Sequence, residues 1–472
     1  MADVLMIGAG LNGLTTAMLL ARDGHQVTVL ERDPAEPVEE PDEAWQSWDR
    51  KGVNQFRMLH FLLPRWRQIV DAELPDVAAE LERRGGLRYN IIDEAPDFVS
   101  GGHRDGDERY TSLTARRPGI ESAIAAAAAA TPGVTIRRGV SVAALLRGDE
   151  AASGIPHVVG VRTEDGEELR ADLVIDASGR RSSLPRLLAD VGARAPMEEL
   201  EDSGFVYYGR HFRSNDGSLP PMMGPLLQSY GTISILCLPA DNGTWGIGII
   251  ASAKDAAMRA VKDPARWEAV VSRHPLVAHW IDGEPIDEGV AVMAKIEDRW
   301  RRFVVDGTPV ATGVVAVGDS WACTNPSLGR GITIGLLHAL TLRETLRSTG
   351  LGDPVGFAMA FDDGTVRDVE PWYRATLWYD RHRLAEIEAL MEGRDYEPED
   401  ETWGVLHAFQ SAVSSDADLL RAFGEVMGLL ATPDEVFSRP GMLEKVFELG
   451  GNWREAPVLA PTRDELLATA GG

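Results

Sequence analysis

The stretch VLMIGAGLNG, residues 4–13, decides the fold of this chain. An apolar strand runs directly into glycines at positions 8, 10 and 13, and a helical pattern follows. In such a loop Gly8 allows a tight turn, Gly10 lets the backbone approach a pyrophosphate, and Gly13 lets the helix pack closely on the sheet. The N-terminus of the helix then faces the phosphate charge. We therefore predict a dinucleotide site whose contacts are Gly8, Gly10, Leu11, Asn12 and Gly13.

A second strand is predicted at residues 26–30, after an apolar helical face and a stop at Gly24. Glu31 stands at the tip of this strand, where a carboxylate can accept hydrogen bonds from an adenosine ribose. Glu31 could instead be an ordinary surface acid, but the register of strand, helix and second strand favours the ribose. Arg32, the next residue, is a further candidate contact with the cofactor.

Length and hydropathy narrow the class of protein. The chain has 472 residues, which predicts two or three domains. No stretch approaches the ~20 apolar residues of a membrane span, and the first strand begins too early to leave room for a cleaved signal peptide. We therefore expect a cytoplasmic protein without a membrane span.

Charge and cysteine usage exclude several partners. The formal net charge of −26 argues against a nucleic acid or an anionic membrane, since both would be repelled. The two cysteines, Cys237 and Cys323, cannot build a disulfide framework, and no Cys/His cluster has the spacing of metal ligands. We therefore expect no metal site and a small molecule as the substrate.

Two further apolar strands end in glycine-bearing turns. Residues 173–177 lead into DASGRRS at 176–182, and residues 314–317 lead into Gly318 and Asp319. Ligands of open α/β sheets bind at the carboxyl ends of strands, so three such ends would hold one long ligand at three points. A cofactor with a ribityl chain and a ring system suits this arrangement better than NAD. The predicted contacts here are Ser178, Gly179, Gly318 and Asp319.

The middle of the chain has the pattern of an antiparallel sheet. Residues 205–212, 232–238 and 245–250 are β-rich runs separated by Gly/Pro turns, and residues 254–272 are expected to form a covering helix. Two side chains of the first run, two residues apart, share a face that either looks into a substrate pocket or points outward. A tryptophan in the third run is a candidate pocket residue or a packing residue. The candidate substrate contacts are Tyr208, Arg210 and Trp245.

Helices are predicted elsewhere. The six alanines at 125–130 belong to a helix that starts near Pro118 and stops at Pro132 and Gly133. After residue 350 the chain becomes amphipathic, and we expect helices at about 366–392, 403–431 and 440–449.

The third glycine-bearing turn reads GDSWACTNPSLGRGI, residues 318–332. It resembles the FAD-dependent monooxygenases of the p-hydroxybenzoate hydroxylase type, and the resemblance extends over most of residues 1–392. It implies that Asp319 holds the ribityl hydroxyls and that Pro326 lies over the flavin ring. It also implies that backbone amides face the pyrimidine edge of the ring, those of Gly329, Gly331 and Ile332 among them.

The helix that opens near Gly331 gives this arrangement a physical purpose. Reduced flavin gathers negative charge at N1 and the neighbouring carbonyl, and a helix N-terminus presents free N–H groups and about half a positive charge. Charge on the ring is thereby stabilised without a lysine.

Other segments resemble the same family. Residues 117–121, RPGIE, are similar to its Arg-x-x-Leu-Glu segment, which implies that Arg117 reaches the cofactor; pairing within its own helix is the alternative. Val140 is a further candidate contact. Residues 52–60 are similar to the Gly-Val-Pro-Gln-Gly-Arg-His-x-His segment of a branch that includes polyether and squalene-type epoxidases. That likeness makes Arg57 and His60 catalytic candidates, with a structural hydrogen-bonding role as the alternative.

The epoxidase-like segment has three departures, at Asn54, Phe56 and Met58. Residues 369–373 and Asp380-Arg381 are also similar to this branch. At the second turn the sequence has Ala-Ser-Gly, 177–179, where most single-component hydroxylases have Ala-Asp-Gly. This form resembles the epoxidase branch and flavin-dependent halogenases. It leaves open whether NAD(P)H donates electrons directly or through a separate flavin reductase.

The predicted fold is α/β, with a Rossmann-like FAD-binding domain interrupted in sequence, an antiparallel β-sheet substrate domain and a C-terminal helical region. The expected boundaries are 1–85, 112–190 and 300–350 for the first, 86–111 and 191–299 for the second, and 351–472 for the third.

The resemblance implies a monooxygenase that uses O2 through a flavin C4a-hydroperoxide. It would hydroxylate or epoxidise a bulky, largely apolar or aromatic metabolite of secondary metabolism. One alternative is a halogenase, which needs a lysine by the substrate and a Trp-x-Trp-x-Ile-Pro segment; the most similar run here is WGIGI at 245–249. The others are an FAD-dependent reductase of an unsaturated isoprenoid and a non-catalytic protein that binds flavin or ligand.

Overall fold

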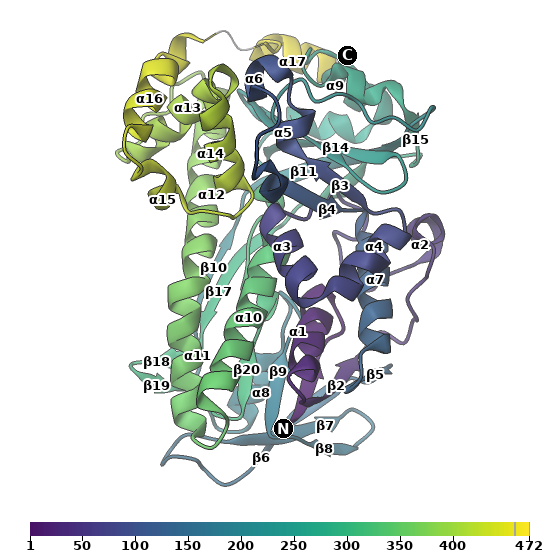
Figure 1. Ribbon diagram of the computed structural model, residues 1–472, viewed down its shortest axis with the longest axis vertical. Coiled ribbons are helices and arrows are strands. Elements are labelled where there is room, and N and C mark those ends of the chain that lie inside the picture. Colours follow the sequence, from purple (N-terminus) through teal and green to yellow (C-terminus); the bar gives the residue numbers. More distant parts are fainter. Residues whose placement is uncertain (457–458, 472) are drawn as a thin grey trace.

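The computed structural model describes residues 1–456 and 459–471 (Figure 1). Its central feature is a five-stranded parallel sheet in the order β20-β9-β1-β2-β5. Segments far apart in the sequence therefore lie side by side, and their carboxyl ends meet at one edge. The strands are β1 (Asp3–Ile7), β2 (Gln26–Glu31), β5 (Val134–Arg138), β9 (Leu173–Asp176) and β20 (Val314–Ala316).

Three helices cover one face of this sheet: α1 (Leu11–Arg22), α7 (Arg117–Ala130) and α10 (Gly331–Thr349). The alanine run belongs to α7, where side chains of one carbon let α7 approach α1 closely. The other face is covered by the hairpin sheet β6 (Val142–Arg147), β7 (Val158–Thr163) and β8 (Glu168–Arg170), and by α8 (Leu184–Asp190).

A second, antiparallel sheet has the order β12-β13-β14-β11-β15, with β16 also paired to β11. One face of it packs against α9 (Pro264–Ser272) and α17 (Arg463–Gly471). The single helix expected at 254–272 is divided, because α9 begins at Pro264 and the Asp263 side chain caps it; a 3-10 turn at Ala257–Lys262 precedes it. The strands are β11 (Phe205–Arg213), β12 (Leu227–Tyr230), β13 (Ile233–Pro239), β14 (Thr244–Ser252), β15 (Glu284–Pro285) and β16 (Ala291–Met293).

Smaller sheets and short helices complete the fold. A three-stranded sheet is formed by β10 (Met197–Asp202), β17 (Glu297–Arg302) and β21 (Ala322–Cys323). Two hairpins are formed by β3 (Leu87–Asn90) with β4 (Thr111–Thr114), and by β18 (Val304–Val305) with β19 (Thr308–Pro309). The short helices are α2 (Pro41–Ser47), α3 (Pro64–Glu73), α4 (Pro75–Arg83), α5 (Ile91–Glu94) and α6 (Asp97–Ser100).

The chain after residue 350 is helical, as expected, but more divided. The predicted helix at 403–431 is two helices, because Asp416 caps a new start with its side chain. The two long helices α11 and α12 run along one side of the molecule (Figure 1). No helix in the described part of the chain combines the length and apolar character needed to cross a membrane. The helices are α11 (Pro354–Asp368), α12 (Glu370–Met391), α13 (Thr402–Ala412), α14 (Ala417–Met427), α15 (Pro433–Phe437) and α16 (Met442–Gly450).

The predicted fold class is confirmed: a Rossmann-like parallel sheet interrupted in sequence, an antiparallel sheet and a helical C-terminal region. The expected boundaries of the domains stay a prediction.

Candidate active site

A cavity of about 840 Å³ opens at the carboxyl ends of β1, β9 and β20 and extends to the antiparallel sheet. Its walls include residues of three loops, 8–12, 178–181 and 319–332, which we call the cradle. All the predicted cofactor contacts line the cavity except Gly13 and Gly318, which lie directly behind its wall.

The glycine loop of the cradle is fixed by close backbone approaches. Gly8 has a φ of +103°, and a Cβ there would lie 2.7 Å from the carbonyl oxygen of Ala177. A Cβ on Gly13 would lie 2.2 Å from the carbonyl oxygen of Gly8. Around Gly10 there is nothing within 4 Å, and this residue lines the cavity. The loop therefore presents bare backbone to the cavity, which suits a pyrophosphate.

A buried arginine organises the acidic residues beside the glycine loop. Glu31 accepts hydrogen bonds from the backbone N–H of Ala9 (2.9 Å) and from Arg50 (3.0 Å). The Arg50 side chain is 6% exposed and also pairs with Asp33 (3.1 Å) and Glu121 (3.2 Å). Burial acts to raise the pKa of Glu31, but Arg50 and two backbone amides outweigh it and hold the pKa below its usual value. Glu31 thus faces the cavity as a carboxylate of fixed orientation.

Asp319 carries a carboxylate that lacks a partner. No group in the described part of the chain donates a hydrogen bond to it, although the residue lines the cavity. Burial raises the pKa of its carboxyl, against the attraction of Arg117 and Arg180. The neighbouring Ser320 hydroxyl accepts a hydrogen bond from the backbone N–H of Gly179 (2.9 Å) and ties the second loop to the third. A carboxylate in this position needs hydroxyl donors, which a ribityl chain supplies.

The third loop ends at a helix N-terminus that faces the cavity. A 3-10 turn at Pro326–Leu328 is followed by Gly329, whose φ is +65°, and α10 begins at Gly331. A Cβ on Gly331 would meet nothing within 4 Å. The first N–H groups of α10 are therefore open to an anionic edge of a ligand.

Arg117 and His60 lie together on the cavity wall. Arg117 donates to His60 Nε2 (3.1 Å) and to Glu121 (2.7 Å), and His60 Nδ1 is 2.9 Å from the carbonyl oxygen of Met58. Burial, with the charge of Arg117, lowers the pKa of His60 to about 3. Both ring nitrogens of a neutral His60 are used in these bonds, which favours the structural hydrogen-bonding alternative over a catalytic role.

Arg57, the other catalytic candidate, does not line the cavity. Its guanidinium donates to the backbone carbonyl oxygens of Trp45 (2.7 Å) and Trp48 (3.2 Å) and so holds the preceding segment in place. These contacts favour the structural alternative for Arg57 over a catalytic role.

The three expected substrate contacts face the opposite side of the antiparallel sheet. The backbone carbonyl of Tyr208 accepts a hydrogen bond from Trp267 of α9 (2.9 Å), Arg210 pairs with Glu268 of α9, and Trp245 donates to Trp280 (2.7 Å). Their neighbours in the alternation face the cavity instead, which corrects the expectation for Tyr208, Arg210 and Trp245. The residues of this sheet that line the cavity are Tyr207, Leu227, Leu236, Leu238, Gly248 and Met293.

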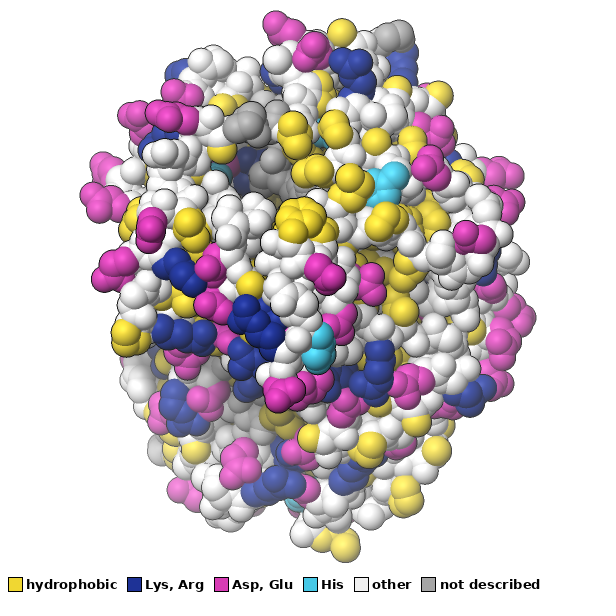
Figure 2. Space-filling model, turned by 45° about the horizontal axis from the view of Figure 1, so that its top comes forward, with side chains coloured by type: hydrophobic (Ala, Val, Ile, Leu, Met, Phe, Trp, Pro, Cys, Tyr) yellow, Lys and Arg dark blue, Asp and Glu magenta, His cyan; other side chains and the backbone are white. Residues whose placement is uncertain are grey.

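Beyond the cradle the cavity becomes apolar, and we call this part the chamber. Its far wall comes from α5, α6, α13 and α14, a role that the sequence did not predict for the C-terminal helices. Two of its residues are also exposed outside, Phe98 at 88% and Met223 at 53%, and hydrophobic side chains gather on the upper part of the face in Figure 2. Besides the residues of the sheet, the chamber is lined by Ile91, Phe98, Val99, Met222, Met223, Leu226, Gln410, Val413, Ser414, Leu420, Phe423 and Met427.

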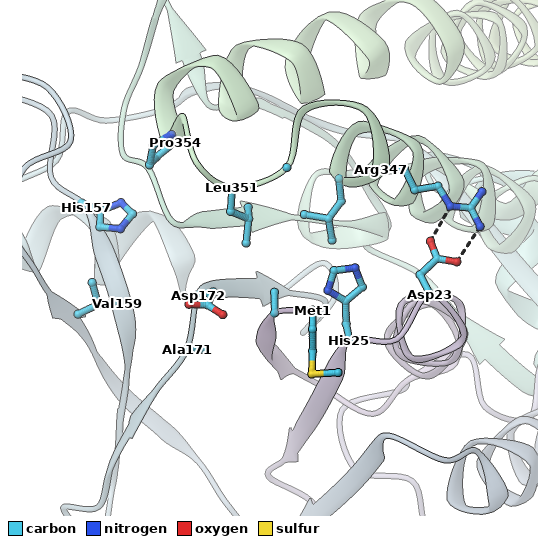
Figure 3. Close-up of a pocket in the computed structure, with 13 residues that line it drawn as sticks. Met1, Asp23, His25, His157, Val159, Ala171, Asp172, Arg347, Leu351 and Pro354 are labelled. Atoms are coloured by element: carbon cyan, nitrogen blue, oxygen red, sulfur yellow. Dashed lines mark hydrogen bonds and ion pairs between the residues drawn. The ribbon is translucent and has the colours of Figure 1, made fainter.

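A second hollow of about 780 Å³ lies at the amino ends of the parallel strands. Figure 3 shows Met1, His25 and Asp172 on its wall, with the ion pair of Asp23 and Arg347 (2.6 Å) at one side. Ligands of open α/β sheets bind at the opposite edge. We therefore place the functional site at the first cavity.

Known proteins match the segments that build the cradle. A profile described as FAD dependent oxidoreductase matches residues 3–97, which hold the glycine loop, Glu31 and Arg50. The FAD-dependent monooxygenase fsr3 of Gibberella fujikuroi is 26% identical over 74% of this chain and 66% of its own length. The protein is an FAD-dependent oxidoreductase.

Other relatives of this oxidoreductase carry different names. Protein Rv3254 of Mycobacterium tuberculosis is 29% identical, over 78% of this chain and 77% of the relative. The menaquinone reductase of Mycolicibacterium smegmatis is 25% identical, over 75% and 78%. A profile described as tryptophan halogenase matches residues 119–204, which include the second loop of the cradle.

The fold of the oxidoreductase also has solved counterparts. The crystal structure of PqsL, a probable FAD-dependent monooxygenase from Pseudomonas aeruginosa, superposes with a TM-score of 0.57 at 19% identity. The match covers 82% of this chain and 99% of PqsL.

Proposed function

We propose that the oxidoreductase is a monooxygenase that places one oxygen atom of O2 on a bulky, largely apolar or aromatic metabolite, as a hydroxyl or an epoxide. The balance is substrate, O2, NAD(P)H and a proton giving oxygenated substrate, water and NAD(P)+. One observation carries the proposal: the cradle opens without interruption into the apolar chamber, so a ring held by the cradle would meet a substrate held by the chamber.

The cradle residues fit FAD from end to end. Bound FAD supplies the redox chemistry and the reaction with O2. We assign the backbone at Gly10 to the pyrophosphate, Glu31 and Arg32 to the ribose, and Asp319 to the ribityl hydroxyls. The turn at Pro326 and the N-terminus of α10 take the ring, where free N–H groups stabilise negative charge as it develops. We propose that these residues belong to one domain, with the boundaries expected above.

The chamber serves to exclude water and to orient the substrate. Its walls are mostly methionine, leucine, valine and phenylalanine side chains, and Tyr207, Gln410 and Ser414 contribute polar groups. Apolar walls favour a neutral, apolar substrate and strengthen electrostatic interactions at the ring edge. Its resemblance to the epoxidase branch suggests an alkene or an electron-rich ring as the reacting group.

Two routes could deliver electrons. Direct use of NAD(P)H would need a second nucleotide to approach the cradle, and the sequence holds no second glycine-rich dinucleotide motif. A separate flavin reductase is the other route. We propose to test direct reduction by NAD(P)H and reduction by a separate flavin reductase side by side.

A halogenase is the second candidate because the tryptophan halogenase profile matches residues 119–204. Halogenases of this type need a lysine beside the substrate. Among the described residues that line the cavity the lysine is Lys51, which is exposed and lies next to Gly52 and Arg32 rather than in the chamber. This placement favours oxygenation over halogenation.

The test is turnover of the FAD-loaded protein with ¹⁸O-labelled O2 and a panel of polycyclic aromatic and polyene compounds. We run it in the presence of bromide, with NADPH alone and with NADPH plus a flavin reductase. We expect substrate-dependent O2 consumption and a product that carries one ¹⁸O atom. Bromide incorporation would identify a halogenase, and a product that gains two hydrogens without O2 would identify a reductase. Flavin that binds but never turns over would identify a binding protein.

A further inference from the structure

A buried carboxyl on α12 is hydrogen-bonded to the third loop of the cradle, on the side of the loop away from the cavity. Asp380 is 2% exposed, and its Oδ1 accepts hydrogen bonds from Asn325 Nδ2 (3.1 Å) and from the Ser327 hydroxyl. Ser327 and the adjacent Pro326 line the cavity. The second oxygen, Oδ2, is buried and has no hydrogen-bond partner among the described residues. The function proposed above makes no use of this carboxyl.

Asn325 extends the contact to two other elements. Its backbone N–H donates to Asp298 on β17 (2.6 Å), and its side-chain oxygen accepts from the Tyr207 hydroxyl on β11 (2.7 Å). Tyr207 belongs to the wall of the chamber. The loop expected to carry the flavin ring is thus fixed to α12, to β17 and to the chamber wall through one buried network.

The network is poor in positive charge. A cation whose charge acts on Asp380 is Arg330, which donates to Thr376 (3.3 Å) and forms no ion pair with Asp380 within the described structure. Asp298 adds a second carboxyl, and Tyr207 and Tyr379 add buried phenols. Burial raises the pKa of Asp380 to about 8 and that of Asp298 to about 6. Near pH 7 the Asp380 carboxyl is therefore mostly protonated and neutral.

A buried acid of this kind lowers the stability of the protein. Its unfolded pKa is about 3.9, so the folded state holds a proton that the unfolded state has already lost. Stability is full below that pH and falls as the pH rises toward 8. An asparagine would make similar hydrogen bonds without this cost, so packing alone does not account for the carboxyl.

We propose that Asp380 is a positioning residue for the flavin ring: it clamps the loop at residues 324–331 through Asn325 and Ser327, and it carries the proton that keeps this clamp neutral. When the proton leaves, the negative charge on Asp380 repels Asp298 and disturbs the loop that touches the ring. The inference needs FAD in the cradle but does not depend on oxygen transfer, so it can fail independently of the proposed monooxygenase activity.

The experiment compares the wild-type holoprotein with Asp380→Asn, Asp380→Ala and the control Glu388→Gln. Glu388 lies on the same helix, pairs with Lys254 (2.7 Å) and is outside the cradle. Visible absorbance and fluorescence of bound FAD are recorded from pH 6 to 9, below the ionisation of the flavin itself, and FAD is titrated into each apoprotein. Thermal unfolding at pH 5 and pH 8 reports the folded state.

We expect the flavin spectrum of the wild type and of Glu388→Gln to change with a midpoint near pH 8, and that of Asp380→Asn to stay constant. Asp380→Ala should bind FAD about 10-fold more weakly, as the loss of one hydrogen-bonded clamp predicts. Relative to the wild type, Asp380→Asn should be more stable at pH 8 than at pH 5.

The inference is overturned if Asp380→Asn keeps the same spectral transition, or if the wild type shows none while binding FAD. It is also overturned if a folded Asp380→Ala binds FAD as the wild type does. Should Asp380→Ala fail to fold, the comparison of Asp380→Asn with Glu388→Gln decides the question. A merely structural carboxyl would change unfolding but would leave the spectrum of bound flavin independent of pH.

Discussion

The cradle and the chamber belong to one cavity but are built on different principles. The cradle depends on backbone: Gly8 and Gly13 sit where a single methyl group would overlap a carbonyl oxygen. The chamber depends on side-chain volume, with flexible methionines and leucines supplied by strands, short helices and the C-terminal bundle. One part of the cavity therefore has almost no freedom to change, and the other has a great deal.

This difference fits the division of roles that we propose, with the cofactor in the cradle and the substrate in the chamber. A rigid cradle suits a ligand that is always the same, which is the cofactor. A chamber lined by adaptable apolar side chains suits a substrate whose shape differs between related enzymes. The predictions below test this contrast, from the largest expected effect to the smallest.

The largest effect is expected at Gly13. In Gly13→Ala the new methyl group would lie 2.2 Å from the carbonyl oxygen of Gly8, so α1 must move away from the turn and the pyrophosphate site is lost. Titration of apoprotein with FAD should detect no binding.

Two other glycines serve as controls that separate a loss of FAD binding from a general effect of adding a methyl group. Around Gly10 and Gly404 an added Cβ would meet nothing within 4 Å. We expect Gly10→Ala to fold normally and yet to bind FAD weakly, because the methyl group takes the space of the pyrophosphate. Gly404→Ala, inside α13, should leave FAD binding intact and stabilise the protein by about 0.5–1 kcal/mol. Unchanged FAD binding in Gly13→Ala would disprove the backbone argument.

Arg50 should matter most for stability. Arg50→Met leaves Glu31 and Asp33 buried without their cation, while Glu121 keeps only its contact with Arg117. Breaking buried pairs in this way costs about 3–5 kcal/mol, and urea denaturation at pH 7.5 measures it. The control is Arg83→Met, where the guanidinium is about half exposed and the loss should stay below about 1 kcal/mol. Equal losses in the two variants would mean that the buried cluster has no special role.

His338, buried behind the cradle, should make stability depend on pH. Its Nδ1 accepts from the backbone N–H of Gly318 (3.3 Å) and its Nε2 is 3.1 Å from the Thr365 hydroxyl. Burial lowers its pKa to about 3, whereas the unfolded value is about 6.5. The folded state thus resists protonation, and stability is full above pH 6.5 and lost as the pH falls toward 3.

Because His338 is protonated in the unfolded state only, the free energy of unfolding should be about 2 kcal/mol lower at pH 5 than above pH 6.5. His338→Gln removes the titrating group, so the difference in unfolding free energy between wild type and variant should shift by that amount between pH 7.5 and 5. A difference that is the same at both pH values would show that His338 is not held neutral.

The smallest effects on folding are expected in the chamber. Leu236 borders open space, so Leu236→Ala should cost about 1 kcal/mol or less, leave FAD affinity unchanged and alter the preference among substrates of different width. Ile235, on the other face of β13, is fully buried against α9, and Ile235→Ala should cost about 2–5 kcal/mol. Urea denaturation and competition between substrates provide the two measurements. A larger loss of unfolding free energy in Leu236→Ala than in Ile235→Ala would mean that the face of β13 with Leu236 packs in the core and does not line the chamber.

The loops of the cradle could be located from the sequence because their backbone conformation requires particular residue types at particular positions. Glycines at fixed spacing after a strand, and Glu31 and Asp319 at strand ends, follow from the fold of the loops themselves. The sequence left the face of Tyr208 and Arg210 open because both faces of β11 are buried, and alternation alone does not say which face meets a ligand.

Other parts of the site could not be predicted from pattern. Arg50 and Asp380 act through partners far away in the chain, such as Glu121 and Asn325, and no local spacing signals such contacts. The C-terminal helices were expected as amphipathic segments, but their apolar faces do not reveal that α13 and α14 close the chamber.

The order of strands in the central sheet has a consequence for biosynthesis. Its five members are drawn from between residue 3 and residue 316, and the first strand lies in the middle. During translation β1 leaves the ribosome long before β9 exists, so the edge of β1 that pairs with β9 stays unpaired until then. The free edge of β9 in turn stays unpaired until β20 is made. The parallel sheet is therefore completed only when β20 has left the ribosome, and the three loops of the cradle come together only afterwards.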